Sequence, residues 1–148
     1  MSAVQVDFHI LASADENARC TYACRVVEKA RERGHHVYLR VADDTAAGEL
    51  DNLLWTFRDR SFLPHAVDAP GAPDEHEPVL IGTGDAPSRG EPDVLVNLAL
   101  TVPAQPDQYA RIVEIGDNQD HVLRAARQRF RTYRDLGITP EHRTVEGA

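Results

Sequence analysis

Apolar and polar residues alternate near the start of the chain and then take up helical spacing. Val4, Val6, Phe8 and Ile10 are separated by polar residues, which predicts a strand with one apolar face. From residue 20 onward, apolar positions recur every three or four residues, which predicts a helix that Gly34 can terminate. These positions are Cys20, Ala23, Cys24, Val27 and Ala30.

Strands and helices continue to alternate along the rest of the chain. We expect strands at residues 35–41, 79–81, 93–100 and 112–115, and helices leading to residue 55, at 104–111 and at 120–136. Asp43 or Asp44 can cap the helix that leads to Trp55, and Gly137 can end the last helix. This alternation predicts a single α/β domain over residues 1–148, with three layers: a mostly parallel central sheet flanked by helices.

A Rossmann-like sheet of this kind often holds a nucleotide, which requires a glycine-rich phosphate loop. No glycine follows the first strand between residues 11 and 18. Gly82 and Gly84 form the one candidate loop, but it has neither a third glycine nor a P-loop lysine. We therefore expect a Rossmann-like fold without a nucleotide-binding loop and without a cofactor. A small-molecule or nucleotide-dependent enzyme is the alternative, which bound nucleotide or turnover would support.

Cys20 and Cys24 lie four residues apart on one helix face, where two metal ligands could sit. No segment rich in Cys or His supplies the remaining ligands, so we interpret both as small buried residues and expect no metal. The serine-containing segments also lack a G-x-S-x-G nucleophile elbow. The sequence therefore predicts no catalytic residues and no intrinsic catalytic activity.

Acidic residues outnumber basic ones, 24 to 16, which gives the 148-residue chain a formal net charge of −8. Binding nucleic acid over a whole surface requires clustered Lys and Arg, which a chain with this net charge does not favour. We therefore expect protein partners and only indirect contact with DNA. No apolar run approaches membrane-spanning length, and the start lacks the basic region of a secretory signal. With only two cysteines as well, the expected location is the cytoplasm, without membrane contact.

The last predicted helix combines an apolar arc with a row of arginines. At about 100° per residue the apolar side chains share one arc, which contains Val122, Leu123, Ala126, Phe130 and Tyr133. Within about 80° along one border of this arc lie Arg124, Arg127, Arg131 and Arg134. Such a row is either a solvated face or a site for an acidic peptide with an apolar end, because guanidinium groups pair bidentately with carboxylates. Direct nucleic-acid binding is a further alternative, which the net charge opposes.

A string from residue 49 to residue 65 contains the only tryptophan and two of the four phenylalanines. Its helical part has an apolar face made by Leu50, Leu53, Leu54 and Phe57. The string resembles the chi subunit family of bacterial DNA polymerase III in both residue type and order. The matching residues are Leu50-Asp51, Leu54-Trp55 and Ser61-Phe62-Leu63-Pro64-His65. The resemblance extends over residues 6–11, 24–30, 34–39, 78–81, 93–98 and 126–134, whereas residues 82–92 and the last residues do not match clearly.

This resemblance implies a noncatalytic adaptor of the DNA polymerase III holoenzyme that joins the clamp loader to single-stranded-DNA-binding protein. It also implies that the acidic C-terminal tail of that protein, which ends in proline-phenylalanine, binds the last helix. Arg127, Phe130 and Arg131 match the family's arginine, aromatic and basic positions. With the rest of the row, the expected tail site comprises Arg124, Arg127, Phe130, Arg131, Tyr133 and Arg134.

Two residues depart from the family pattern at this site. Leu123 stands where a basic residue can occur, although Arg124 beside it can replace the charge. Gly116 stands where an apolar pocket residue can occur, which predicts a shallower pocket.

The second surface implied by the resemblance consists of Trp55, Phe62, Leu63 and Pro64. In the family it binds the psi subunit, and another clamp-loader protein or a helicase-like protein is an alternative partner. From residue type alone, these aromatics serve either a folded-back core loop or an exposed anchor for a partner. We expect the chain to be a monomer or part of a heterodimer.

Overall fold

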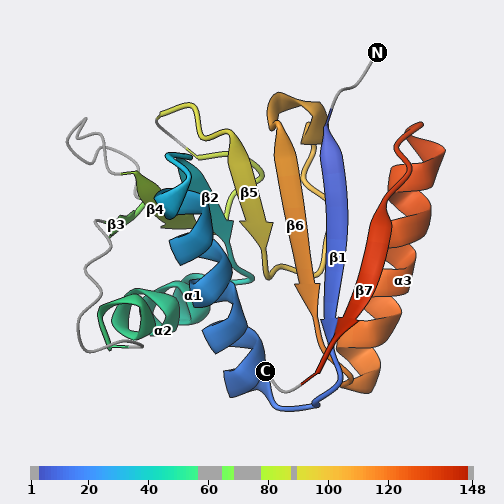
Figure 1. Cartoon of the computed structure of the whole chain (residues 1–148), viewed down its shortest axis with the longest axis horizontal. Coiled ribbons are helices and arrows are strands. Elements are labelled where there is room, and N and C mark those ends of the chain that lie inside the picture. Colours follow the sequence, from blue (N-terminus) through green and yellow to red (C-terminus); the bar gives the residue numbers. More distant parts are fainter. Residues whose placement is uncertain (1–3, 57–64, 69–77, 88–89, 147–148) are drawn as a thin grey trace.

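The computed structural model describes residues 4–56, 65–68, 78–87 and 90–146, which form a seven-stranded sheet and three α-helices (Figure 1). The strands are β1 (Gln5–Leu11), β2 (Val37–Arg40), β3 (His65–Val67), β4 (Val79–Gly82), β5 (Val94–Asn97), β6 (Arg111–Gly116) and β7 (Glu141–Val145). The helices are α1 (Glu16–Glu32), α2 (Asp44–Thr56) and α3 (Asp120–Asp135), and a short 3-10 helix, η1, covers Pro106–Gln108. The strand order is β3-β4-β2-β5-β6-β1-β7, and all neighbouring pairs are parallel. The predicted α/β fold class is confirmed.

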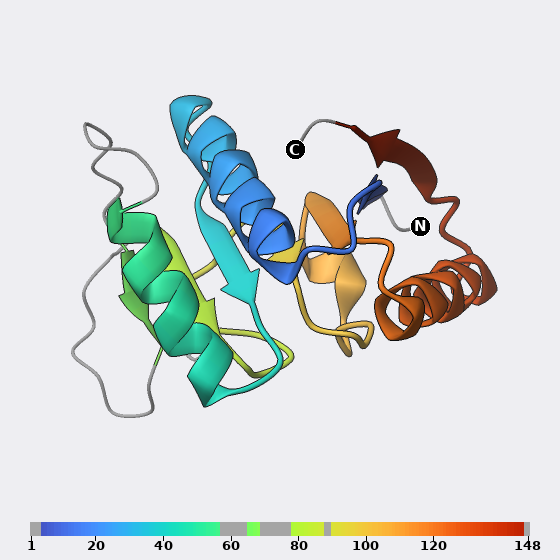
Figure 2. The same ribbon diagram turned by 90° about the horizontal axis from the view of Figure 1, so that it is seen from below.

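The helices cover opposite faces of the sheet, as predicted, so the domain has two cores. Side chains of α1 and α2, including Val27 and Leu50, pack with those of the central strands on one face. Ala126 and Tyr133 of α3 pack with Phe8 and Ile112 on the other face. Figure 2 shows α1 and α2 side by side, with α3 alone near the β7 end of the sheet. Helix α3 therefore lies close to the β7 edge of the sheet.

Local capping fixes where the helices begin and end. The Asp15 carboxylate accepts a hydrogen bond from Asn17 N at 2.9 Å, and Asp43 does the same for Ala46 N at 2.8 Å. Asp43, rather than Asp44, is thus the cap of α2. After α3, Gly137 has a φ of +84°, a left-handed conformation that favours glycine and that lets Ile138 N reach the Tyr133 carbonyl. The predicted end of the last helix is confirmed.

Three elements differ from the sequence-based expectation. The short helix expected at residues 104–111 is only η1, and β6 already begins at Arg111. The edge strands β3 and β7 were not expected at all. The side chains of β7 are nearly all exposed, so its sequence lacks the apolar alternation that marks a half-buried strand.

A polar cluster lies inside the core between the sheet and α3. The Glu114 carboxylate is fully buried and accepts hydrogen bonds from Arg129 Nε at 3.0 Å, Tyr133 Oη at 2.6 Å and Asn97 Nδ2 at 3.0 Å. Burial, together with the adjacent Glu114 carboxylate, raises the pKa of Tyr133, so its hydroxyl remains protonated and donates. This Glu114 cluster ties α3 to β5 and β6.

Candidate functional site

A groove of about 620 Å³ lies between α3 and the edge of the sheet formed by β1 and β7. We call it the α3 groove. Its lining residues are Phe8, Ile10, Leu123, Ala126, Arg127, Phe130, Arg131, His142, Arg143 and Thr144. The N-terminal strand β1 and the C-terminal elements α3 and β7 thus build one site.

The floor of the α3 groove is apolar and aromatic. Phe8 lies with its ring centroid 5.5 Å from that of Phe130, and the His142 ring packs edge-on against Phe130 at 5.9 Å. The parallel register pairs Phe8 with His142 and Ile10 with Thr144, so these side chains of β1 and β7 face α3 together. An apolar side chain entering the groove would therefore meet rings on two sides.

Arg127 and Arg131 are one helical turn apart, and both are exposed where they line the α3 groove. Arg131 Nη2 donates to Gln128 Oε1 at 3.1 Å. Among the described residues, neither arginine forms an ion pair with an acidic side chain. Two guanidinium groups beside an apolar floor suit a ligand that has both carboxylates and an apolar group.

The structure divides the predicted tail-site residues into three groups. Arg127, Phe130 and Arg131 line the α3 groove. Arg124 and Arg134 are exposed on α3 but are not part of the groove lining. Tyr133 was placed wrongly on this surface, because its side chain is fully buried and bonded to Glu114.

The two departures from the family pattern have clear structural settings. Leu123 lines the α3 groove and adds apolar surface where a basic residue can occur. A Cβ atom on Gly116 would lie 2.9 Å from Ile10 Cδ1, so the Ile10 side chain occupies the space beside the glycine. Since Ile10 itself lines the groove, apolar surface is present there in spite of the glycine.

Sequence reasoning missed the part of the groove that comes from β1 and β7. Phe8 and Ile10 had been recognised as one face of a strand, but nothing in a periodic pattern says which helix that face meets. His142 and Thr144 lie two residues apart, which is the spacing of one strand face. That spacing was the only available signal, and it is weak without flanking apolar residues.

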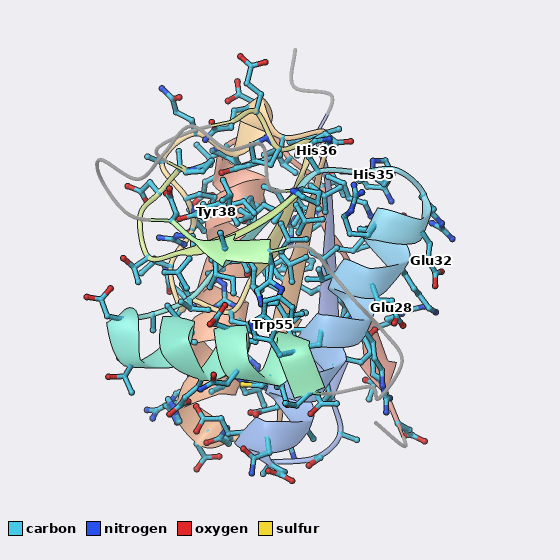
Figure 3. The ribbon with its side chains drawn as sticks, turned by 90° about the vertical axis from the view of Figure 1, so that its left-hand side faces the viewer. Glu28, Glu32, His35, His36, Tyr38 and Trp55 are labelled. Carbon is cyan, nitrogen blue, oxygen red and sulfur yellow. The ribbon has the colours of Figure 1, made fainter. Side chains whose placement is uncertain are left out.

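The second predicted surface is partly visible. Trp55 is 47% exposed on the last turn of α2, and its ring lies 4.3 Å from that of His65 on β3 (Figure 3). His65 Nε2 in turn lies 3.1 Å from the Asp51 carboxylate. Leu50 and Leu54 of the same helix are buried, as predicted. Phe62, Leu63 and Pro64 lie outside the described residues.

The sequence model of the family described as DNA polymerase III chi subunit, HolC, matches residues 3–141. The chain belongs to this family. The DNA polymerase III subunit chi of Pseudomonas aeruginosa is 39% identical over 133 residues, covering 90% of this chain and 91% of that protein. The Escherichia coli protein of the same description is 26% identical over 115 residues, covering 78% of each chain. The chi-family match places the chain in DNA replication and confirms the resemblance seen in the sequence.

The fold itself recurs in a protein outside the chi family. The crystal structure of T4 UvsW superposes with a TM-score of 0.69 and 8% sequence identity, over 99% of this chain and 42% of that chain. At this identity the likeness shows the fold alone.

In this chi-family chain the two candidate phosphate-loop glycines are packed against polar side chains. A Cβ atom on Gly82 would lie 2.7 Å from the Tyr38 hydroxyl oxygen. That hydroxyl donates to the Gly84 carbonyl at 2.8 Å, and Arg40 Nε donates to the same carbonyl at 3.3 Å. The missing side chain of Gly82 therefore leaves room for Tyr38, and the Gly84 carbonyl is an acceptor for two internal hydrogen bonds.

The structure also bears on the metal site considered for the two cysteines. Cys24 is fully buried and Cys20 partly buried, and burial raises the pKa of the Cys24 thiol to about 12. Within the described ranges, no group of three or more His, Cys, Asp or Glu side chains is arranged to hold a metal ion. None of the described helices combines the length and the apolar character needed to span a bilayer.

Proposed function

We propose that this chi-family chain is a noncatalytic adaptor that binds the acidic C-terminal tail of single-stranded-DNA-binding protein and links it to the clamp loader in the cytoplasm. The observation that carries the proposal is the α3 groove, where Arg127 and Arg131 stand beside the Phe8 and Phe130 rings. The tail has the matching chemistry: acidic side chains, a chain-terminal carboxylate and a final phenylalanine.

The two halves of the groove would hold different parts of the tail. The terminal phenylalanine ring would enter the apolar floor, where burying such a side chain contributes about 1.5–3 kcal/mol. The tail carboxylates would accept hydrogen bonds from Arg127 and Arg131, each contributing about 1.5–3 kcal/mol before ordering costs. Both contributions together give moderate affinity, which suits a link that must be made and broken.

The arrangement of the sheet supports simultaneous binding of two partners. Strands β3 and β7 are the opposite edges of the sheet (Figure 1). The α3 groove lies at the β7 edge, whereas Trp55 packs on His65 of β3. A partner at Trp55, together with Phe62, Leu63 and Pro64 of the adjoining segment, would not obstruct the tail. We assign this second surface to the psi subunit or to another clamp-loader or helicase-like protein.

The tail chemistry can be tested from the ligand side. A tail peptide lacking its final phenylalanine is expected to bind about tenfold or more weakly than the full peptide, because the aromatic floor stays unfilled. A peptide with an amidated C-terminus is expected to lose affinity as well, because one carboxylate partner of the arginines is gone. Fluorescence anisotropy with labelled peptides measures both effects. Equal affinities for all three peptides would show that the groove does not recognise the chain end.

The Trp55 surface gives a second prediction. Trp55→Ala is expected to change the melting temperature little, since the ring is 47% exposed. The same change is expected to weaken binding of the clamp-loader partner by about 2 kcal/mol or more. Leu136→Ala is the matched control, because Leu136 is another large apolar side chain, 56% exposed, on a different surface. Calorimetric titration of the partner measures the difference. A Trp55 variant that is strongly destabilised, or that binds the partner normally, would remove this surface from the proposal.

A further inference from the structure

A second groove, of about 540 Å³, lies on the opposite face of the sheet, between α1 and the β1–β7 edge. We call it the basic groove. Its positively charged lining comes from α1, β6 and β7, and consists of Arg25, Lys29, Arg33, Arg111 and Arg143. Five such side chains in one groove stand out in a chain whose net charge is −8.

Most of this positive charge is not neutralised locally. Asp7 pairs with Arg111, at 2.8 Å between Oδ2 and Nη2. Four cations remain that form no ion pair with an acidic side chain of the described residues: Arg25, Lys29, Arg33 and Arg143. The same part of α1 also carries two acidic residues, Glu28 and Glu32, which are labelled in Figure 3. Neither of them lines the basic groove.

Two histidines, His9 and His35, also line the basic groove. His9 hydrogen-bonds Tyr22 Oη through Nδ1 at 2.6 Å. Burial, followed by the nearby Arg143, lowers the pKa of His9 to about 4, so its ring is neutral. His35 is held by the Asp93 carboxylate. The four cations without an acidic partner among the described residues therefore gain no charge from His9 at neutral pH.

The spacing of the cations suits a polymer with evenly spaced negative charges. Arg25 and Lys29 of α1 and Arg33, the C-cap residue directly after it, follow each other at i, i+4 and i+8, so successive side chains start about 6 Å apart along the helix axis. This spacing is comparable to that between neighbouring phosphates of an extended nucleic-acid strand. Arg143 of the edge strand β7 lines both grooves, and its Nη2 donates to Tyr22 Oη of α1 at 3.5 Å, which places its guanidinium on the side of the row.

We propose that the basic groove binds the phosphate backbone of a single-stranded nucleic acid. A flexible single strand can follow a concave groove between a helix and a sheet edge, and each phosphate would meet one cation. The acidic tail is a poorer fit here, because the aromatic floor that would take its final phenylalanine belongs to the α3 groove. The net charge of −8 favoured only indirect contact with DNA, but a local cluster of cations attracts phosphates even on an acidic protein. The inference is independent of tail binding.

Salt-dependent binding of a labelled oligothymidylate of about 12 nucleotides tests the proposal. With four phosphates neutralised, the slope of log K against log salt is expected to be about −2.8, since each contact contributes about −0.7 for a single strand. In Arg25→Gln/Lys29→Gln the slope is expected to fall to about −1.4. The matched control is Arg124→Gln/Arg134→Gln, which removes the same charge from exposed positions outside both grooves and should leave the slope unchanged.

Three results would overturn the inference. The first is no binding of the oligonucleotide at low salt, and the second is the same loss of slope in both double variants, which would indicate diffuse attraction. The third is displacement of the oligonucleotide by polyglutamate as effectively as by unlabelled oligonucleotide, which would assign the groove to acidic protein segments. Tail-peptide affinity of Arg25→Gln/Lys29→Gln should remain that of the wild type, so failure here leaves the α3 groove proposal intact.

Discussion

Replacing Glu114 by Ala is expected to lower the free energy of unfolding by about 3–5 kcal/mol. The carboxylate is fully buried and is the acceptor for Arg129, Tyr133 and Asn97. Its removal would leave the buried Arg129 guanidinium without this counter-charge, and an unpaired charge in the core costs far more than a lost surface pair. Chemical denaturation followed by circular dichroism measures the change.

The control for this prediction removes the charge on both sides. Glu114→Leu/Arg129→Leu is expected to be more stable than Glu114→Ala alone, because no charge is then left buried. Arg129 already has two buried nitrogen atoms, Nη1 and Nη2, with no hydrogen-bond partner among the described residues, so its burial is costly from the start. A loss of less than about 1 kcal/mol in Glu114→Ala would show that the Glu114 cluster is not a main stabilising feature.

Arg127→Ala/Arg131→Ala is expected to weaken binding of the tail peptide at least a hundredfold, which corresponds to about 3 kcal/mol. Both guanidinium groups line the α3 groove without an acidic partner among the described residues, so their removal takes away tail contacts and little else. The melting temperature should change little, because both side chains are exposed. Anisotropy titration of the labelled tail measures the affinity.

The matched control for the arginine pair is Arg124→Ala/Arg134→Ala. These two arginines also lie on α3 and are exposed, but they do not line the α3 groove. Their removal changes the net charge equally, so a comparable loss of affinity in both variants would mean that charge alone, and not the groove, attracts the tail. The wild-type affinity in the control, with a large loss in Arg127→Ala/Arg131→Ala, is the expected outcome.

The helices were predictable because each has an apolar face with a clear period and a recognisable end. In α3 the same pattern also brought Arg127 and Arg131 together. All four arginines lie along one border of the apolar arc, and a helical wheel does not show how far along that border a groove extends. Arg124 and Arg134, the first and last of the row, could therefore not be separated from the other two. The wheel also placed Tyr133 at the site, although packing against Phe8 and Glu114 takes its ring into the core.

The edge strands were not predictable because their stability comes from pairing rather than from burial. The side chains of β7 from Glu141 to Thr144 are exposed, yet the strand pairs along β1 from Asp7 to Leu11. The backbone hydrogen bonds of such a strand leave no signature in residue type. For this reason one wall of the α3 groove, formed by His142 and Thr144, could only come from the structure.

The buried charges were missed although one signal was present. Arg129 occupies a position seven residues after Val122 and four before Tyr133, which is the spacing of the buried face of α3. Arginine side chains are mostly exposed in proteins, and Arg129 was therefore not included in the predicted apolar face of this helix. The partner Glu114 lies within the strand Arg111–Gly116, whose neighbours Val113 and Ile115 face the other core. A charged residue at a core position of a helix indicates a buried partner of opposite charge.

The adaptor role is tested most directly by assembly of three components: this chain, single-stranded-DNA-binding protein and the clamp-loader partner. Size-exclusion chromatography with light scattering is expected to show one complex containing all three proteins. Arg127→Ala/Arg131→Ala should lose only single-stranded-DNA-binding protein from that complex, and Trp55→Ala should lose only the clamp-loader partner, because the two surfaces lie at opposite edges of the sheet. Mutually exclusive binding of the two partners, or a complete ternary complex with both variants, would contradict the account.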